Sequence, residues 1–399
     1  MNDFKVLKEH GSGKLLESNG FLVANLSGSN EEMGAQYGAM LEDRMQSAYN
    51  LIVQPAINSG ALSQEQVQVW ANRAYSTCST RNKQFYDGVA KGSGWSREKV
   101  CMLDQIMEFG IYQSKLHSFA GCTTIMSWAS HSVDGGMYSG RNMDWSDEFN
   151  KFETILTVRN PTDGSYKFAT AGWPGMYCAF TAVNEHGVYL DVHDGTSMGG
   201  SLVFLERPSI LNLLTDILSE CDSLSAVVAR MNGTQNSTSL ILSLGDRNGA
   251  GSMECSSLGG NRVRYPEGDS FTVVNSFFDK NWGLGKRETV SNSLRRHKNM
   301  TDRLAENNGK MDAAKVRELM DLRLFNPDGS FAVPGGCTKP TMQDADLTNY
   351  QMVVDYQKLH VWLKIPSPEI FADWTGFDLN ALWKSDADQI PGAPSTGTA

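Results

Sequence analysis

The stretch that decides the fold is FAGCTTIMSWASHSVDGGMYSGRNMDW, residues 119–145. A glycine and a cysteine, Gly121 and Cys122, stand directly before an alternating apolar run, which is typical of a half-buried strand. The DGG at 134–136 predicts a tight turn, and the strand expected after it carries GRNMDW at 140–145. The stretch therefore predicts a β-hairpin with a cysteine at its start.

The residues on either side of this hairpin predict different structures. Residues 30–118 predict helices, because apolar residues recur at helical spacing and Ser63 with Gln66 forms a capping box. Strands joined by tight turns are expected from Cys122 to about Asn275. Helices are expected between and after these strands at 209–220, 223–231, 291–307 and 312–322, and a last hairpin at 349–365.

This order of elements predicts an α+β layered domain in which helices cover sheets. We expect a helical N-terminal segment at 1–121 and the layered domain at 122–388. A tail rich in Pro, Gly, Ser and Thr at 389–399 is expected to be disordered.

Charge and hydropathy exclude several classes of protein. The 399 residues carry a formal net charge of −10, which argues against a nucleic-acid binder, because that function usually needs a basic face. No apolar stretch approaches the roughly 20 residues of a membrane-spanning helix. The start of the chain lacks the apolar core of a signal peptide, so the cytoplasm is the default location.

The cysteines and histidines predict neither a disulfide framework nor a metal site. The seven cysteines are an odd number, widely spaced and without a CxxC pair. The seven histidines form no HExxH motif, and we expect no metal and no cofactor. The DVHDG at 191–195 could suggest metal ligands, but a strand that ends in an Asp-Gly turn is the favoured interpretation.

Cys122 can act as a nucleophile only if a base removes its proton, because a free thiol has a pKa of about 8.5. No catalytic signature surrounds any histidine. If the chain is cut before Cys122, the new α-amino group, with a pKa of about 7.7–8.0, could be that base. Gly121 suits such a cut, because glycine reaches strained geometry at least cost. The alternative is a loop glycine followed by a buried strand cysteine.

The sequence GCTTIMSW at 121–128 followed by GRNMDW resembles N-terminal nucleophile (Ntn) hydrolases of the choloylglycine hydrolase and penicillin acyltransferase (C45-like) type. In that superfamily a cysteine follows the cleaved bond, and a strand after the first hairpin carries an Arg or Gln, an Asn and an Asp. Acid ceramidase and its relatives have a similar strand. The resemblance implies a four-layer αββα sandwich of two antiparallel sheets, with Arg141 and Asp144 pointing toward Cys122.

Three more stretches extend the resemblance: AVNEHGVYLDV, VVNSFF and NSLRRHKNM. They imply that Asn184 is an oxyanion-hole or substrate-contact residue and that Asn275 is the second oxyanion donor. Arg296 takes the position of a family arginine, with Arg295 as the fallback. One departure is Ser276, where the family often has a histidine. A second is the absence of the fungal acyltransferase arginine near Cys337, which argues against a penicillin precursor as the substrate.

The implied roles follow from amide chemistry. Cys122 Sγ attacks an amide carbonyl to form a thioester, and its amino group passes the proton to the leaving amine. Asp144 would hydrogen-bond the α-amino group, and Arg141 would keep that carboxylate ionised. The side-chain amides of Asn184 and Asn275 would stabilise the oxyanion. The alternatives are turn formation for Asn184, strand-end ion pairs for Arg141 and Asp144, and a helix-surface charge for Arg296.

The sequence therefore predicts a self-processing cysteine amidohydrolase that cleaves the linear amide bond of an N-acylated amine or amino acid. Its cleaved N-terminal fragment would remain as a partner, and a homo-oligomer is also possible. In AGWPGMY, residues 171–177, Trp173, Met176 and Tyr177 could line an acyl pocket, although core packing explains them equally well. The alternative functions are an acyltransferase that passes the acyl group to an amine and a non-catalytic binding protein with the same fold.

Overall fold

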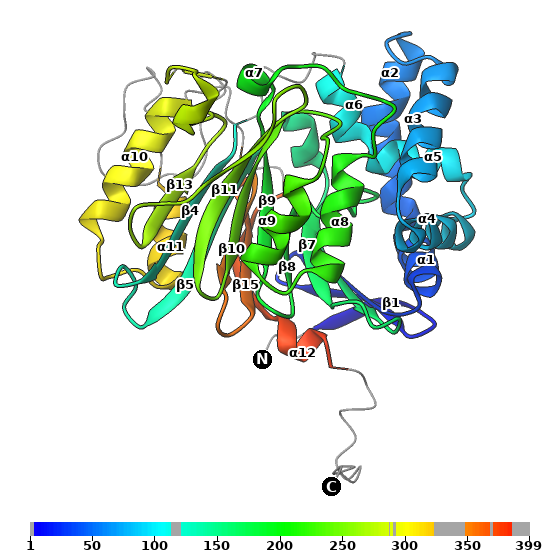
Figure 1. Cartoon of the computed structure of the whole chain (residues 1–399). Coiled ribbons are helices and arrows are strands. Elements are labelled where there is room, and N and C mark those ends of the chain that lie inside the picture. The colour runs from blue at the N-terminus through cyan, green and yellow to red at the C-terminus, as the bar shows by residue number, and fades with distance from the viewer. Residues whose placement is uncertain are drawn as a thin grey trace, which may run out of the picture.

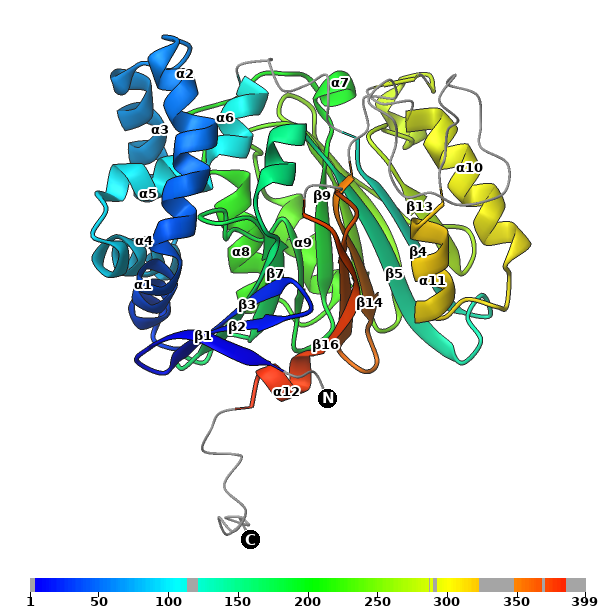
Figure 2. The same ribbon diagram turned by 180° about the vertical axis from the view of Figure 1, so that it is seen from behind.

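Two sheets lie face to face in the computed structural model, with helices outside them (Figures 1 and 2). The structure describes residues 4–112, 121–286, 288–289, 293–322, 348–367 and 370–384. The expected tail at 389–399 and Cys337 lie outside these ranges.

The larger sheet has ten strands in the order β1-β2-β3-β6-β7-β8-β9-β10-β11-β12. Neighbouring strands are antiparallel except β3 and β6, which pair in parallel. The strands are β1 (Lys5–His10), β2 (Gly13–Ser18), β3 (Phe21–Gly28), β6 (Ile155–Pro161), β7 (Phe168–Gly172), β8 (Thr181–Asn184), β9 (Tyr189–Asp194), β10 (Leu240–Asp246), β11 (Gly249–Ser256) and β12 (Gly260–Arg264).

The smaller sheet has six antiparallel strands in the order β13-β4-β5-β14-β15-β16. The expected hairpin of 119–145 forms the pair β4 (Thr123–Ala129) and β5 (Gly135–Asp144). The other strands of the smaller sheet are β13 (Ser270–Val273), β14 (Thr348–Asp355), β15 (His360–Ile365) and β16 (Ala372–Asp378). The alternation along β4 and β5 places every second side chain between the two sheets.

Helices cover the outer face of each sheet. The apolar faces of α8 (Ile210–Glu220) and α9 (Leu224–Asn232) pack on the outer side of β8 to β11, in a cluster that includes Leu214, Leu242 and Val227. On the smaller sheet, α10 (Ser293–Glu306) and α11 (Ala313–Met320) pack on β4, β5 and β14 in a second cluster. A third cluster fills the space between the sheets. These layers confirm the predicted αββα sandwich.

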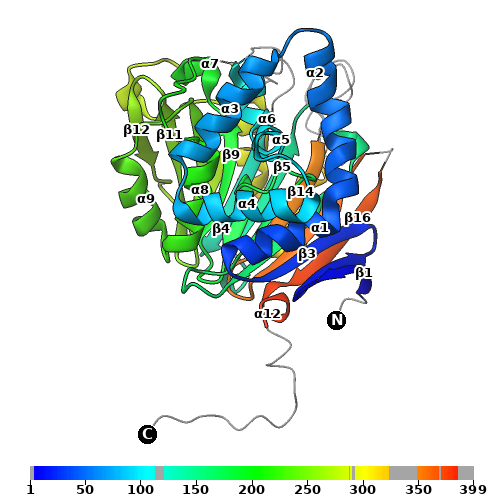
Figure 3. The ribbon, with the colours of Figure 1, turned by 90° about the vertical axis from the view of Figure 1, so that its right-hand side faces the viewer.

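The N-terminal helices lie beside the sandwich (Figure 3). They are α1 (Asn30–Ala48), the π-helical η1 (Tyr49–Val53), α2 (Gln54–Asn58), α3 (Gln64–Thr77), α4 (Thr80–Ser93), α5 (Arg97–Asp104) and α6 (Ile106–Tyr112). The predicted capping box is present, since Ser63 Oγ accepts from Gln66 N at 3.1 Å. Short helices elsewhere are η2 (Asp147–Lys151), α7 (Thr196–Gly199), η3 (Lys280–Trp282) and α12 (Leu379–Leu382).

One expectation about this segment needs correction, because residues 5–28 are three strands rather than part of a helical segment. Asn19 and Gly20 form the two-residue turn between β2 and β3, and both have positive φ. An Asn-Gly pair between apolar runs is a strong hairpin signal, because this turn matches the twist of the flanking strands. The N-terminal segment therefore joins the larger sheet through β3 and β6.

Candidate active site

Cys122 lies immediately before β4 and is only 2% exposed. Its side chain and that of Thr124 face the space between the sheets, where Thr124 Oγ1 donates to Asp191 on β9 at 2.7 Å. The intervening Thr123 faces the opposite way, toward α10, and its hydroxyl accepts from Arg296 at 2.7 Å. The thiol therefore lies inside the sandwich, while the main chain beside it can be reached from the helical layer.

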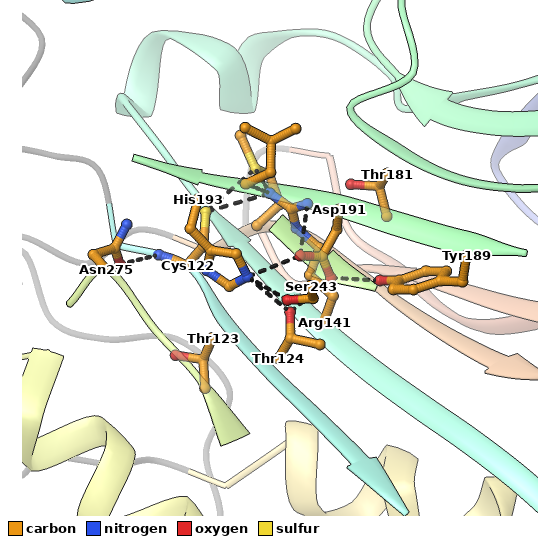
Figure 4. Close-up of polar contacts among 12 residues, drawn as sticks. Cys122, Thr123, Thr124, Arg141, Thr181, Tyr189, Asp191, His193, Ser243 and Asn275 are labelled. Carbon is orange, nitrogen blue, oxygen red and sulfur yellow. Dashed lines mark hydrogen bonds and ion pairs between the residues drawn. The ribbon is translucent and has the colours of Figure 1, made fainter. Parts of the chain in front are cut away.

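Arg141 comes from the neighbouring strand β5, directly opposite Thr124. Its Nη2 lies 3.4 Å from Cys122 Sγ (Figure 4). Nη2 also donates to Val192 O at 2.6 Å, and Nη1 donates to Phe180 O at 2.9 Å. The predicted approach of Arg141 to the thiol is present. The guanidinium also spans the two sheets, because Val192 belongs to the larger one.

The nitrogen and the carbonyl oxygen of Cys122 have partners as well. Asn275 Oδ1 accepts from Cys122 N at 2.9 Å. Arg296 Nη1 donates to Cys122 O at 2.5 Å, and its Nη2 donates to Asn275 Oδ1 at 2.9 Å. Arg296 is buried, whereas the fallback Arg295 is exposed. The structure therefore brings Asn275 and Arg296 to Cys122.

The Asn275 amide is oriented with its oxygen toward Cys122 N and its nitrogen toward the carbonyl of Asp194, at 3.1 Å. In this arrangement the amide oxygen of Asn275 holds the nitrogen of Cys122, and its amide nitrogen donates to the larger sheet. Its role as an oxyanion donor stays a prediction.

Asp144, at the end of β5, contacts the Gly121–Cys122 segment through its main chain. Asp144 O accepts from Gly121 N at 3.2 Å and lies 4.0 Å from Cys122 Sγ. The carboxylate instead accepts from Thr348 Oγ1 at 2.7 Å. The expected hydrogen bond from the nitrogen of Cys122 to this carboxylate is not formed in the uncut chain, where that nitrogen is an amide.

Burial raises the pKa of the Asp144 carboxyl to about 6, while the charge of Arg296 is the largest influence that lowers it. Arg141 has a smaller effect on this carboxyl, because its own ion-pair partner is Asp191 at 3.6 Å. Both arginines therefore favour the ionised carboxylate, and Arg296 has the larger effect.

The raised pKa predicts a pH-dependent stability. An unfolded Asp has a pKa of about 3.9, so the unfolded chain loses this proton at lower pH than the folded chain. Between pH 4 and 6 the folded chain binds more protons, and its stability therefore falls as the pH rises through this range. In the uncut Cys122→Ala chain, Asp144→Asn should remove about 2 kcal/mol of the loss between pH 4.5 and 7.5. Urea unfolding at both pH values measures the difference. Other groups that titrate in this range, such as Asp216, are present in both chains and contribute equally. The same pH dependence with and without Asp144→Asn would therefore contradict the prediction.

Asn184 is not brought to Cys122 by any of its contacts. Its Nδ2 donates to Leu218 O at 3.0 Å and to Cys221 O at 2.8 Å, at the end of α8. Its Oδ1 accepts from His186 N and Val188 N in its own turn. Both amide protons are used, so the side chain has no donor left for an oxyanion. Asn184 has the turn-forming role that the sequence left open.

The expected acyl-pocket residues divide into two groups. Trp173 and Met176 line an apolar cavity of about 10 Å³ with Phe180, whose carbonyl binds Arg141. A cavity of this size is at the limit for a single water molecule. Tyr177 instead packs against Tyr37 and other aromatic rings of the N-terminal helices. Trp173 and Met176 are therefore placed near the site in a closed pocket, and Tyr177 belongs to the core.

Two groups near the thiol were missed by the sequence interpretation, Asp191 and His193. His193 Nε2 lies 2.8 Å from Asp191 Oδ1, and both side chains are fully buried (Figure 4). The signal was the DVH alternation, which places both residues on the same face of a strand. Sequence alone does not show that this face looks toward Cys122.

The protonation states follow from burial and charge. Burial raises the pKa of the Cys122 thiol, although Arg141 acts to lower it. Burial likewise lowers the pKa of His193, despite the nearby Asp191 carboxylate. The pKa of Asp191 is well below its usual range, because the effects of Arg141 and His193 together outweigh burial. The site therefore contains a protonated thiol, a neutral imidazole and a buried arginine–carboxylate pair, and the thiol still needs a base.

A cavity of about 660 Å³ lies elsewhere, between β12, β13 and α10. It contains none of the predicted site residues, although His297 on its wall follows Arg296 in sequence. Within the described ranges, no cluster of three or more His, Cys, Asp or Glu side chains could hold a metal ion. In the same part of the chain, no helix has the length and hydropathy to cross a bilayer.

No protein-family model matches the chain, and no curated protein sequence matches it. In structure it is similar to a mutant of conjugated bile acid hydrolase from Clostridium perfringens, with 16% identity over 66% of this chain and 95% of that one and a TM-score of 0.45. It is also similar to penicillin V acylase from Agrobacterium tumefaciens, with 15% identity over 67% of this chain and 89% of that one and a TM-score of 0.44. A third similar structure is the Caenorhabditis elegans N-acylethanolamine-hydrolyzing acid amidase ortholog, with 14% identity over 59% of this chain and 93% of that one and a TM-score of 0.41. Likeness at this level assigns neither a family nor a reaction to the chain.

Proposed function

We propose that this protein is a self-processing cysteine amidohydrolase that cuts its own chain between Gly121 and Cys122 and then hydrolyses linear N-acyl amides. The observation that carries the proposal is the environment of Cys122. Its nitrogen, its sulfur and its carbonyl oxygen are each held by a different residue that the sequence motifs singled out: Asn275, Arg141 and Arg296.

The lack of a base beside the thiol supports the view that self-processing must precede the hydrolysis of substrates. A protonated, buried thiol is a poor nucleophile, and among the described residues the contacts of Cys122 include no free base. In the first step Sγ attacks the Gly121 carbonyl, the bond from that carbonyl to the Cys122 nitrogen breaks, and the thiol proton passes to this nitrogen. Water then hydrolyses the resulting thioester, which leaves a carboxylate on Gly121 and restores the thiol of Cys122 beside its new α-amino group. That amine would form beside Asn275 Oδ1, which already accepts from the same nitrogen. The reaction thus creates the base where the thiol needs it.

The cleaved fragments should stay together. Strand β3 lies before the proposed cut and pairs with β6 after it, from Leu22 with Ile155 to Gly28 with Pro161. The buried Arg73 of α3 donates to Arg207 O, beyond the cut. Removing the N-terminal fragment would therefore expose an edge of the larger sheet and part of its core. We propose a tight heterodimer rather than a discarded propeptide.

In the mature protein, the Cys122 amine would take the thiol proton, and Sγ would attack the amide carbonyl of the substrate. The same amine would return the proton to the leaving amine, and water would then release the acyl group from the thioester. Trp173, Met176 and Phe180 line one apolar cavity, and the Phe180 carbonyl binds Arg141, so we propose that these residues contact the acyl chain.

The experiment is an assay of the purified protein with N-acyl amino acids and N-acyl amines of increasing acyl length. We expect release of free amine and, by intact mass, a transient gain of one acyl group on the fragment that begins at Cys122. Adding a second amine separates hydrolysis from acyl transfer. A correctly cleaved protein that hydrolyses no substrate of this series and gains no acyl group would contradict the proposal.

A further inference from the structure

We propose that Asp191 and His193 are positioning residues that hold the Arg141 guanidinium against Cys122 Sγ, and this role rests on the proposed function. Arg141 reaches the thiol across the space between the sheets, so its position depends on what holds it at the far side. Both residues belong to β9, which also supplies the Val192 carbonyl bound by Arg141.

Asp191 is fixed by contacts from both sheets. Its Oδ2 accepts from Thr124 Oγ1 at 2.7 Å, from the smaller sheet, and from Tyr189 OH at 2.6 Å, from its own strand. Its Oδ1 lies 3.6 Å from Arg141 Nη1. With Oδ2 held in this way, the carboxylate cannot turn away from the guanidinium without breaking buried hydrogen bonds, which is costly.

His193 completes the support of Asp191. Its Nε2 lies 2.8 Å from Asp191 Oδ1, 2.8 Å from Ser243 Oγ and 3.3 Å from Thr124 Oγ1. All three contacts fall on the same ring nitrogen. A Ser-His-Asp relay needs one ring nitrogen toward the carboxylate and the other toward the hydroxyl. The group therefore cannot act as such a relay, and the imidazole serves as a brace.

The strand register explains why this group is rigid. Asp191 lies directly opposite Ser243 on β10, and the two-residue period of β9 puts Tyr189, Asp191 and His193 on its inner face. Thr124 and Arg141 are opposite each other on the smaller sheet. The pair Asp191–Ser243 of the larger sheet therefore faces the pair Thr124–Arg141 of the smaller sheet.

The charges explain why a carboxylate is needed. Arg141 is fully buried, and an unpaired buried guanidinium would be expensive. Asp191 balances its charge without touching the thiol. Nη2 then contacts Sγ together with Val192 O and Met143 Sδ. A neutral His193 adds a close polar contact at 2.8 Å and no further charge. Arg141 therefore acts on the thiol as a fixed local donor.

The alternative is that the group only joins the two sheets. A double-mutant cycle separates the two roles, because a residue that acts through Arg141 loses its effect once Arg141 is changed. The variants are Asp191→Asn, Arg141→Lys and both together in the full chain. The measurements are the half-time of self-cleavage by intact mass and the thermal unfolding of each variant before it is cut.

We expect Asp191→Asn to slow self-cleavage on the order of 100-fold, because a small displacement of a catalytic group has an effect of this size. The double variant should cleave no more slowly than the slower single variant. Multiplied slowing in the double variant, or unchanged cleavage with a lower unfolding temperature, would overturn the inference.

Glu254→Gln is the matched control, because Glu254 is also fully buried and lies 3.5 Å from Arg264 Nε, while its contacts include neither Cys122 nor Arg141. It should cleave at the normal rate. If Asp191→Asn does not fold, His193→Gln and His193→Ala replace it: Gln keeps a donor where Nε2 stood and should cleave faster than Ala, and equal rates would overturn the inference.

Failure of the proposed function has a different outcome. If the unaltered chain is never cut, the proposed function fails, and crystal structures of Asp191→Asn and Glu254→Gln then test the inference directly. The distance between the Arg141 guanidinium and Cys122 Sγ should increase in Asp191→Asn and stay the same in Glu254→Gln. An unmoved guanidinium in Asp191→Asn would overturn it.

Discussion

Replacement of Cys122 by alanine should leave the chain in one piece and abolish hydrolysis of N-acyl amides. The variant keeps the β4 backbone and loses only the sulfur, so the fold should be retained. Without the thiol, neither the thioester with Gly121 nor the one with a substrate can form. A single species of 43.9 kDa by intact mass and no release of amine above the uncatalysed rate are the expected results.

The matched control is Cys255→Ala. Cys255 is a fully buried strand cysteine on β11, so its replacement removes the same atom from a similar environment. This variant should be cut and active, apart from a loss of stability of about 1 kcal/mol. Cleavage between Gly121 and Cys122 in the Cys122→Ala chain would rule out Cys122 as the nucleophile of self-processing.

Replacement of Arg296 by methionine should both destabilise the uncut chain and stop its cleavage. Arg296 donates to Cys122 O, Thr123 Oγ1 and Asn275 Oδ1, and its charge opposes that of the buried Asp144 carboxylate. Removing one member of a buried charge arrangement costs about 3–5 kcal/mol. We expect a loss of this size in urea unfolding of the Cys122→Ala background, and less than about 1% of the normal cleavage rate in the native sequence.

The adjacent Arg295 provides the control, because it lies on the exposed face of the same helix turn. Arg295→Met should change stability by less than about 0.5 kcal/mol and leave cleavage unchanged. Similar effects of the two substitutions would mean that a general charge on α10, rather than the contacts of Arg296, matters.

The hairpin and the helices could be predicted because their signals are local. The β4–β5 hairpin and the cap at Ser63 each depend on a few neighbouring residues, and both are present. The turn of the hairpin lies at 130–134 rather than at 134–136, because β5 already begins at Gly135. The strands at 5–28 carry an equally local signal in Asn19-Gly20, although their place directly before a run of helices favours a helical segment. The pairing of β3 with β6 could not be predicted, because these two strands are more than a hundred residues apart in the sequence.

The site divides in the same way. Cys122 and Arg141 are neighbours in one hairpin, so motif and strand pairing together place them correctly. Asn184 and Tyr177 depend on which helix packs against them, which the sequence pattern does not show. Asp191 and His193 matter only because the two sheets face each other at this point, and that contact is absent from any single motif.

The most direct test of self-processing is the intact mass of the purified, unaltered protein. Our account predicts two chains that purify together, of about 13 kDa and about 31 kDa, in proportion to 121 and 278 of the 399 residues. The larger chain should begin at Cys122. A single fully folded chain of 43.9 kDa that persists on incubation, or a cut at any other bond, would contradict the account.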